Sequence, residues 1–317
     1  MRNMFANFNN QAFIVQDVIN DFVSSKDGKQ SEKTVKYYRE RLKEFNDFLK
    51  QEGILHVHEI TRAVVDRYMG ARKAKNPKIS NQTLNSYLRA IRAFVNYCIE
   101  EDYMKYFKIT MYPKTSIPKK PYTEEEQALL LKKPDMNKCT FADYRNWVIV
   151  CHFLASGNRS RTVRYIRIKH VELDRKRIVL DTTKNNEVLY MPISDIYYPI
   201  IREYLKIRKG EPEDFLFCNQ HGEQLTEGGL RKNMYNYNKG RGVETTSLHR
   251  FRNTFAETWI MNDGNPKKLQ YALGHKTASM VDEYVSIYGR ELSKEFNDYA
   301  PLSLQKEMLE TKKKIRL

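Results

Sequence analysis

A histidine and an arginine in the C-terminal half have a spacing that suits a phosphate group. His249 and Arg252 stand three residues apart at the start of an expected helix over 248–261, with Ser247 as its expected cap. This spacing places both side chains on one helix face, near the positive end of the helix dipole. An imidazole and a guanidinium there could bind phosphate oxygens. Taken alone, the pair fits an exposed polar helix face better than a phosphate site.

Other side chains of the same chemistry are spread along this half of the chain. Arg159 follows the tripeptide Ser156-Gly157-Asn158, and Lys184 occupies the expected tip of a β-hairpin. His275 follows Gly274, a residue that commonly ends a helix in the left-handed conformation. A lysine at a hairpin tip is most often simply solvated, so spacing by itself does not assign it a role.

A tyrosine near the C-terminal end could act as a nucleophile toward such a phosphate. Tyr284 lies nine residues after His275, on an expected helix over 279–288 that also carries Val281 and Val285. A tyrosine flanked in this way also fits a core position. Tyr288, one turn later on the same face, is a rival for the nucleophile.

The elements that would position these residues divide into two domains. The N-terminal third shows apolar residues at helical spacing, most clearly in a helix that begins near Ser80 and exposes Arg89 and Arg92 on its other face. A proline- and lysine-rich stretch follows, and Thr123 then precedes three glutamates, a typical helix start. We therefore expect a small helical domain over 1–112, a linker over 113–122 and a second domain over 123–317.

The second domain is expected to be mixed, so that the whole chain is mainly α with a small β-sheet. Two short β-type runs, 177–181 and 188–192, flank a polar turn and predict a hairpin. Helices are expected over 144–155, 196–205, 248–261 and 266–272, besides the one over 279–288.

Composition narrows the class of partner. The 317 residues carry 55 Lys and Arg against 39 Asp and Glu, a formal net charge of +16, which favours polyanions such as DNA. No apolar run is long enough to cross a bilayer and no secretion signal is evident. The four cysteines lie far apart without a CxxC pair, so we expect neither a zinc site nor disulfides, and a cytoplasmic protein.

The order of these features resembles the tyrosine recombinase (phage integrase) family. An arginine, a lysine on a hairpin, His-x-x-Arg, Gly-His and a tyrosine nine residues on follow one another as they do in that family. The matching stretches are ASGNRSRTVRYIRI at 155–168, TTKNNEVLYMPI at 182–193, SLHRFRNTFAE at 247–257 and LQYALGHKTASMVDEYVSIYG at 269–289. The first third is similar to the family's core-binding domain, notably SYLRAIRAFVNYCIEEDYM at 86–104.

The resemblance implies a role for each matched residue. Tyr284 would attack the scissile phosphate, leaving a 3′-phosphotyrosyl bond and a free 5′-hydroxyl. Arg159 and Arg252 would bind the non-bridging oxygens, which suits fixed guanidinium groups. Lys184 would be the general acid, while His249 would assist proton transfer and His275 would hydrogen-bond the phosphate. The implied chemistry requires no ATP, metal or other cofactor.

Some positions depart from the family's pattern. Arg161 and Thr162 stand where Ser and Glu are common, so the carboxylate that usually braces the first arginine is missing. Asn158 replaces a usual leucine, Arg250 a frequent aspartate and Asn253 a frequent histidine. These changes leave open how Arg159 is held, and we expect them to make the pocket more positive.

The implied partner is double-stranded DNA with a specific site, bound by a tetramer with an accessory bending or excision factor. Arg89 and Arg92 are candidate DNA contacts. The 289–304 stretch resembles tails of integrases from mobile elements, which favours integration and excision. The alternatives are a chromosome or plasmid dimer resolvase of the same chemistry, a catalytically silent DNA-binding protein, and a metal-dependent nuclease or transposase.

Overall fold

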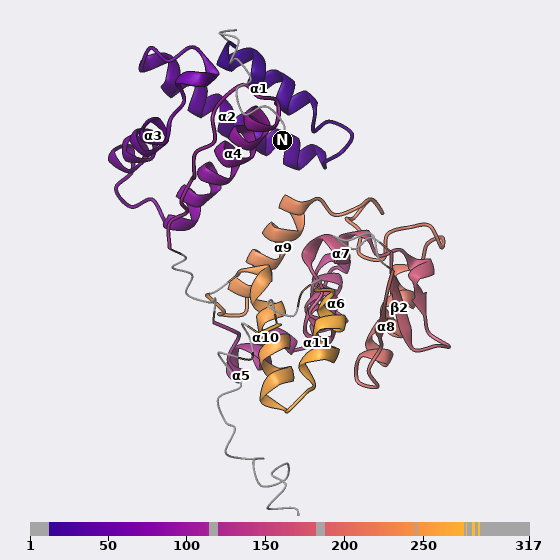
Figure 1. Cartoon of the computed structure of the whole chain (residues 1–317). Coiled ribbons are helices and arrows are strands. Elements are labelled where there is room, and N and C mark those ends of the chain that lie inside the picture. Colours follow the sequence, from indigo (N-terminus) through magenta and orange to yellow (C-terminus); the bar gives the residue numbers. More distant parts are fainter. Residues whose placement is uncertain are drawn as a thin grey trace, which may run out of the picture. The chain divides into compact units, whose positions relative to one another are not determined.

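The computed structural model describes residues 13–113, 120–181, 188–244, 246–275, 277, 281, 282 and 285. Three residues of the expected site, Lys184, Tyr284 and Tyr288, lie outside the described residues. The chain forms two compact units, Met1–Ile117 and Pro118–Leu317 (Figure 1). The expected fold class, mainly helical with a small sheet, is confirmed.

The first unit is helical throughout its regular elements. They are α1 (Val15–Ser24), α2 (Glu32–Gln51), a short 3-10 turn η1 (Val57–Glu59), α3 (Arg62–Lys75) and α4 (Asn81–Glu100). Serine caps start the two longest helices, because the Ser31 and Ser80 hydroxyls accept hydrogen bonds from backbone N–H groups one turn later. One shared apolar core, which includes Phe22, Phe45 and Phe94, holds α1, α2 and α4 together.

The second unit surrounds one long buried helix. Its elements are α5 (Glu124–Leu131), α6 (Phe141–Ser156), α7 (Ser160–Tyr165), η2 (Ile168–His170), β1 (Val171–Glu172), β2 (Arg177–Leu180), β3 (Leu189–Pro192), α8 (Tyr197–Arg208), α9 (Glu227–Lys239), α10 (Leu248–Met261) and α11 (Pro266–Leu273). Helix α6 packs against α5, α8, α9 and α10. Because it is covered on all sides, its apolar residues follow no amphipathic stripe.

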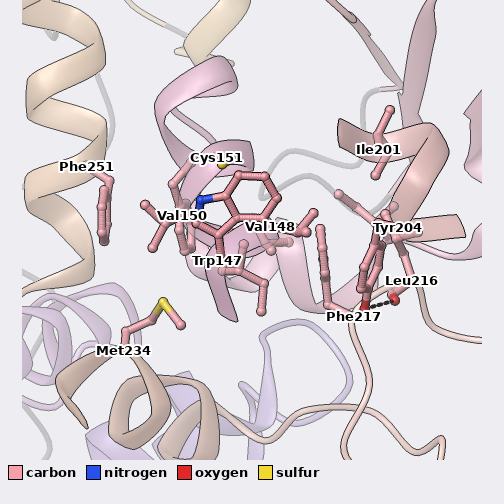
Figure 2. Packing of buried hydrophobic residues seen from close by; sticks show 14 of the residues in the cluster. Trp147, Val148, Val150, Cys151, Ile201, Tyr204, Leu216, Phe217, Met234 and Phe251 are labelled. Atoms are coloured by element: carbon pink, nitrogen blue, oxygen red, sulfur yellow. Dashed lines mark hydrogen bonds between the residues drawn. The ribbon is translucent and has the colours of Figure 1, made fainter. Parts of the chain in front are cut away.

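Figure 2 shows the core around α6. The indole of Trp147 and the side chains of Val148 and Val150 lie among residues from several other elements. Tyr204 of α8 is fully buried there, and its hydroxyl donates a 3.0 Å hydrogen bond to the carbonyl of Leu216. This satisfied polar tip lets a tyrosine occupy an apolar core without an unpaired hydroxyl.

The small sheet has the strand order β1-β2-β3, with antiparallel neighbours. Ile178 pairs with Met191 and Leu180 with Leu189, so the expected hairpin between 177 and 192 is present. Strand β1 and helices α7 and α9 were not anticipated from the sequence. None of the helices in the described ranges is both long and apolar enough to traverse a bilayer.

A cationic cluster around the end of helix α11

The turn between α6 and α7 supplies the first arginine. Gly157 ends α6 with a φ of 60°, and its N–H donates a 2.8 Å hydrogen bond to the carbonyl of Phe153. A β-carbon on Gly157 would lie 2.7 Å from Phe255 and 2.8 Å from Leu273, so both backbone angle and space require glycine. Arg159 follows at the N-cap position of α7, half-buried.

Helix α10 supplies the second arginine and the first histidine. Ser247 stands at the N-cap position as expected, although its side chain forms no capping hydrogen bond. His249 is exposed at the start of the helix, whereas Arg252, one turn later, is only 3% exposed. The i,i+3 spacing thus places a surface imidazole beside a buried guanidinium, and both belong to the first turns of the helix.

The C-terminus of α11 provides the surface on which the arginines rest. Gly274 adopts a left-handed conformation with a φ of 59°, as the Gly-His motif predicted. The backbone of His275 is held twice by Gln270, whose carbonyl accepts from its N–H at 3.0 Å and whose amide donates to its carbonyl at 3.1 Å. The carbonyl oxygens of Leu273 and Gly274 consequently face the two arginines.

Both guanidinium groups bind the same backbone carbonyl. Arg159 Nη1 donates to the oxygens of Leu273 and Gly274, each at 3.3 Å. Arg252 donates from Nη2 to the Leu273 oxygen at 2.8 Å and from Nη1 to the Gly157 oxygen at 2.9 Å. Main-chain oxygens therefore hold both arginines. The glutamate that commonly braces the first arginine in the family is replaced here by Thr162, which is buried.

His275 completes the cluster as a neutral imidazole. Arg252 Nη2 lies 2.5 Å from His275 Nε2, and because a guanidinium can only donate, Nε2 accepts and Nδ1 carries the proton. Burial, and then the positive charges of Arg252, Arg159 and His249, lower the pKa of His275 to about 4. His275 Nδ1 is buried without a hydrogen-bond partner among the described residues.

The structure thus brings together four of the six residues that the sequence analysis selected: Arg159, His249, Arg252 and His275. Lys184 and Tyr284 lie outside the described residues. Val281 is buried and Val285 half-buried in a small apolar cluster. That cluster also contains Leu273, whose carbonyl holds both arginines.

Arg250 was expected to make the pocket more positive, and this expectation is wrong. Its side chain is 7% exposed and forms a bidentate pair with Glu126, with N–O distances of 3.0 and 3.3 Å. It also donates to the carbonyls of Lys120 and Pro121 and lies 4.4 Å over the ring of Tyr122. Its charge is therefore neutralised away from the cluster, and it fixes residues 120–122 to α10.

Helix α4 of the first unit carries a separate polar face. Arg89 and Arg92 are exposed, while the apolar residues of the same helix are buried as expected. Gln82 and Asn96, seven residues before and after Arg89, are also exposed and lie on the same face. Arginine, glutamine and asparagine are side chains that can hydrogen-bond base edges in a bidentate manner.

Across the described residues, no three His, Cys, Asp or Glu side chains gather as they would around a metal ion.

Comparison with known proteins identifies two matching family models. The model of the phage integrase family matches residues 122–290, and that of the phage integrase N-terminal SAM-like domain matches residues 25–102. The tyrosine recombinase XerD of Staphylococcus haemolyticus is 23% identical over 284 residues, which cover 86% of this chain and 93% of that protein. XerD of Staphylococcus epidermidis is 24% identical over 297 residues, covering 91% and 98%.

Solved structures share the fold. The Tn1549 transposon integrase in complex with a circular intermediate DNA superposes with a TM-score of 0.70 at 22% identity, covering 86% of this chain and 95% of that one. XerH bound to a palindromic difH substrate gives a TM-score of 0.69 at 18% identity, covering 91% and 85%.

Proposed function

The chain belongs to the phage integrase family of tyrosine recombinases, which break and rejoin DNA, and we propose that it does so through a covalent bond to Tyr284. The observation that carries the proposal is the pair of guanidinium groups fixed on the Leu273 carbonyl beside a neutral His275. Fixed cations of this kind stabilise charge that develops on the non-bridging oxygens in the transition state.

The proposed reaction proceeds in two reversible steps. The Tyr284 oxygen attacks the phosphorus, the bond to the 5′-oxygen breaks, and Lys184 protonates that oxygen to give a 5′-hydroxyl. A second 5′-hydroxyl then attacks the phosphotyrosine, restores the phosphodiester and releases the phenol. Because the ester retains the energy of the broken bond, rejoining needs no ATP. In this proposal His249 accepts the phenol proton in the first step and returns it in the second, while Lys184 recovers its proton from the attacking 5′-hydroxyl. The proton on His275 Nδ1 would bind a phosphate oxygen.

The decisive experiment traps the covalent intermediate. The substrates are a library of duplexes of randomised sequence, each with a nick in one strand. Cleavage next to the nick releases a short fragment that carries the 5′-hydroxyl, so rejoining fails and the cleaved strand stays bound to the protein. Wild type and Tyr288→Phe should yield adducts that survive denaturing electrophoresis, and Tyr284→Phe should yield none. Adducts with Tyr284→Phe but not with Tyr288→Phe would transfer the role to Tyr288. No adduct from wild type that still binds DNA would favour a silent DNA-binding protein.

The same assay tests metal independence. Addition of EDTA should leave the yield of adduct unchanged, since the proposed mechanism uses only side chains of the chain. Activity that disappears in EDTA and returns with Mg²⁺ would instead favour a metal-dependent nuclease or transposase.

We favour integration and excision of a mobile element as the biological role, from the tail sequence at 289–304 and the likeness to the Tn1549 transposon integrase. The XerD relatives favour the second candidate, a resolvase of chromosome or plasmid dimers. Sequencing the trapped DNA distinguishes them. Sites at the junctions of a mobile element would support the first role, whereas a single chromosomal or plasmid site outside such an element would support the second.

The assembly we propose is a cytoplasmic tetramer on two DNA sites, aided by an accessory factor. The mass of the complex on a trapped site tests it. Four protomers on two joined duplexes are expected, and a complex that never exceeds one protomer per duplex would contradict the proposal. Addition of host extract, with and without protease treatment, shows whether an accessory protein is needed.

A further inference from the structure

The turn at residues 157–159, which contains Arg159 and the carbonyl that accepts from Arg252, packs on a chain of buried polar side chains. Gly157 supplies a carbonyl that holds Arg252, and Arg159 follows two residues later. Between them, Asn158 points into the core and is only 5% exposed. Ser156 supports the same turn, because its hydroxyl accepts from the Asn158 N–H at 3.2 Å and donates to the His152 carbonyl at 2.6 Å.

Asn158 begins a chain that continues through His152 to Tyr197, and we call these three residues the buried polar chain. The Asn158 amide nitrogen lies 3.2 Å from His152 Nε2 and 3.2 Å from the sulfur of Met191. His152 Nδ1 lies 3.0 Å from the Tyr197 hydroxyl. His152 is 0% exposed and Tyr197 2%, so water does not complete these contacts.

The chemistry of the contacts fixes the direction of each hydrogen bond. Since an amide nitrogen only donates, His152 Nε2 must accept and Nδ1 must carry the proton, which it donates to Tyr197. Burial lowers the pKa of His152 to about 3 and raises that of Tyr197, so both side chains are neutral. One tautomer of His152 therefore joins α6, the turn and the first residue of α8.

We propose that Asn158, His152 and Tyr197 position the turn at residues 157–159 and thereby set the distance between Arg159 and Arg252. The family resemblance leads one to expect leucine at position 158, and a leucine has no amide to satisfy His152. The asparagine and the histidine therefore form a matched pair in this chain. The three are positioning residues, because all three side chains are buried and act on the arginines through the turn.

The inference rests on the proposed recombinase function and is tested on the full chain with the trapped DNA site. Single-turnover cleavage is compared on a normal scissile phosphodiester and on a methylphosphonate, which lacks one non-bridging oxygen and its charge. Misplaced arginines should matter most for the charged substrate. We expect Asn158→Leu to slow cleavage of the phosphodiester by on the order of 10-fold, with a much smaller loss on the methylphosphonate.

Two further variants complete the test. Val150→Ala removes apolar packing from the same helix on a face that points away from His152, and it should slow both substrates by the same factor. Tyr197→Phe removes the far acceptor and should show the same preference as Asn158→Leu with a smaller factor. It decides the test if Asn158→Leu does not fold.

Equal losses on both substrates, or none, would overturn the inference and leave the buried polar chain a purely structural feature. A wild-type chain that traps no DNA would refute the proposed function itself, before any variant is compared.

Discussion

Replacing Gly157 by alanine tests whether the turn below the arginines is as tightly built as its geometry indicates. Its φ of 60° is left-handed, which costs an L-residue about 1–2 kcal/mol. The added β-carbon would also lie 2.7 Å from Phe255 and 2.8 Å from Leu273, and overpacking of a core typically costs about 1–3 kcal/mol. Together these effects predict a loss of about 2–5 kcal/mol in the free energy of unfolding.

The matched control is Gly222→Ala in the same unit. Gly222 has a φ of 83°, but no atom lies within 4 Å of the position that an added β-carbon would occupy, so only the backbone cost of about 1–2 kcal/mol applies. Urea denaturation followed by tryptophan fluorescence reports on this unit alone, because both tryptophans, Trp147 and Trp259, belong to it. A Gly157→Ala midpoint equal to that of Gly222→Ala would refute the packing argument.

The same variant should affect cleavage more than stability alone explains. Gly157 also supplies the carbonyl that accepts from Arg252 at 2.9 Å. A displacement of that carbonyl by a few tenths of an ångström would move a guanidinium in the cluster, and we expect cleavage to slow by on the order of 10-fold. Measurements below the unfolding transition separate this effect from loss of folded protein, and Gly222→Ala should cleave at the wild-type rate.

Three further outcomes follow from the described contacts. The pKa of His275 in the folded protein is about 4, below its unfolded value. Its contribution to stability is therefore complete above about pH 6.5 and is lost as the pH falls toward 4. When denaturation is measured at about pH 6.5 and at about pH 4, the free energy of unfolding should fall less for His275→Phe than for wild type. Arg250→Met leaves the half-buried Glu126 carboxylate without its bidentate partner and should lower the free energy of unfolding by about 2–4 kcal/mol. The control Arg231→Met, at an exposed ion pair, should lower it by under about 1 kcal/mol. Equal losses would contradict the role of Arg250 in anchoring residues 120–122. Arg89→Ala should relax base preference at one position of the trapped site by about 1–3 kcal/mol with an unchanged salt dependence; uniform weakening with a shallower salt dependence would make it a phosphate contact instead.

The sequence was sufficient to select four residues that the structure brings together, Arg159, His249, Arg252 and His275, and insufficient to show what holds them. His249 and Arg252 were selected by their place in an ordered set of motifs that resembles the family, and Gly274 was correctly expected to end a helix. The acceptor that both arginines share is a backbone carbonyl, and a backbone carbonyl is present at every position, so no residue type marks it. Only the fold brings Leu273 within hydrogen-bond reach of Arg159.

Errors at the level of elements have similar causes. Arg250 was expected to add charge to the pocket because it stands where the family frequently has aspartate, but its guanidinium is paired with Glu126. Strand β1 has two residues and helix α7 six, which is too short for periodicity to register. Helix α9 is a full helix whose two glycines, Gly228 and Gly229, weaken its signal in the first turn.

The shared carbonyl of Leu273 has a consequence for how this site can evolve and be mapped. A main-chain acceptor remains when the side chain is replaced. Alanine scanning at position 273 would therefore report only the loss of side-chain packing, not the contribution of the carbonyl. Replacing the amide that follows it by an ester, which weakens the carbonyl as an acceptor, would loosen two guanidinium groups at once. Two arginines that are more than ninety positions apart thus depend in part on one main-chain atom, which a coding substitution cannot remove.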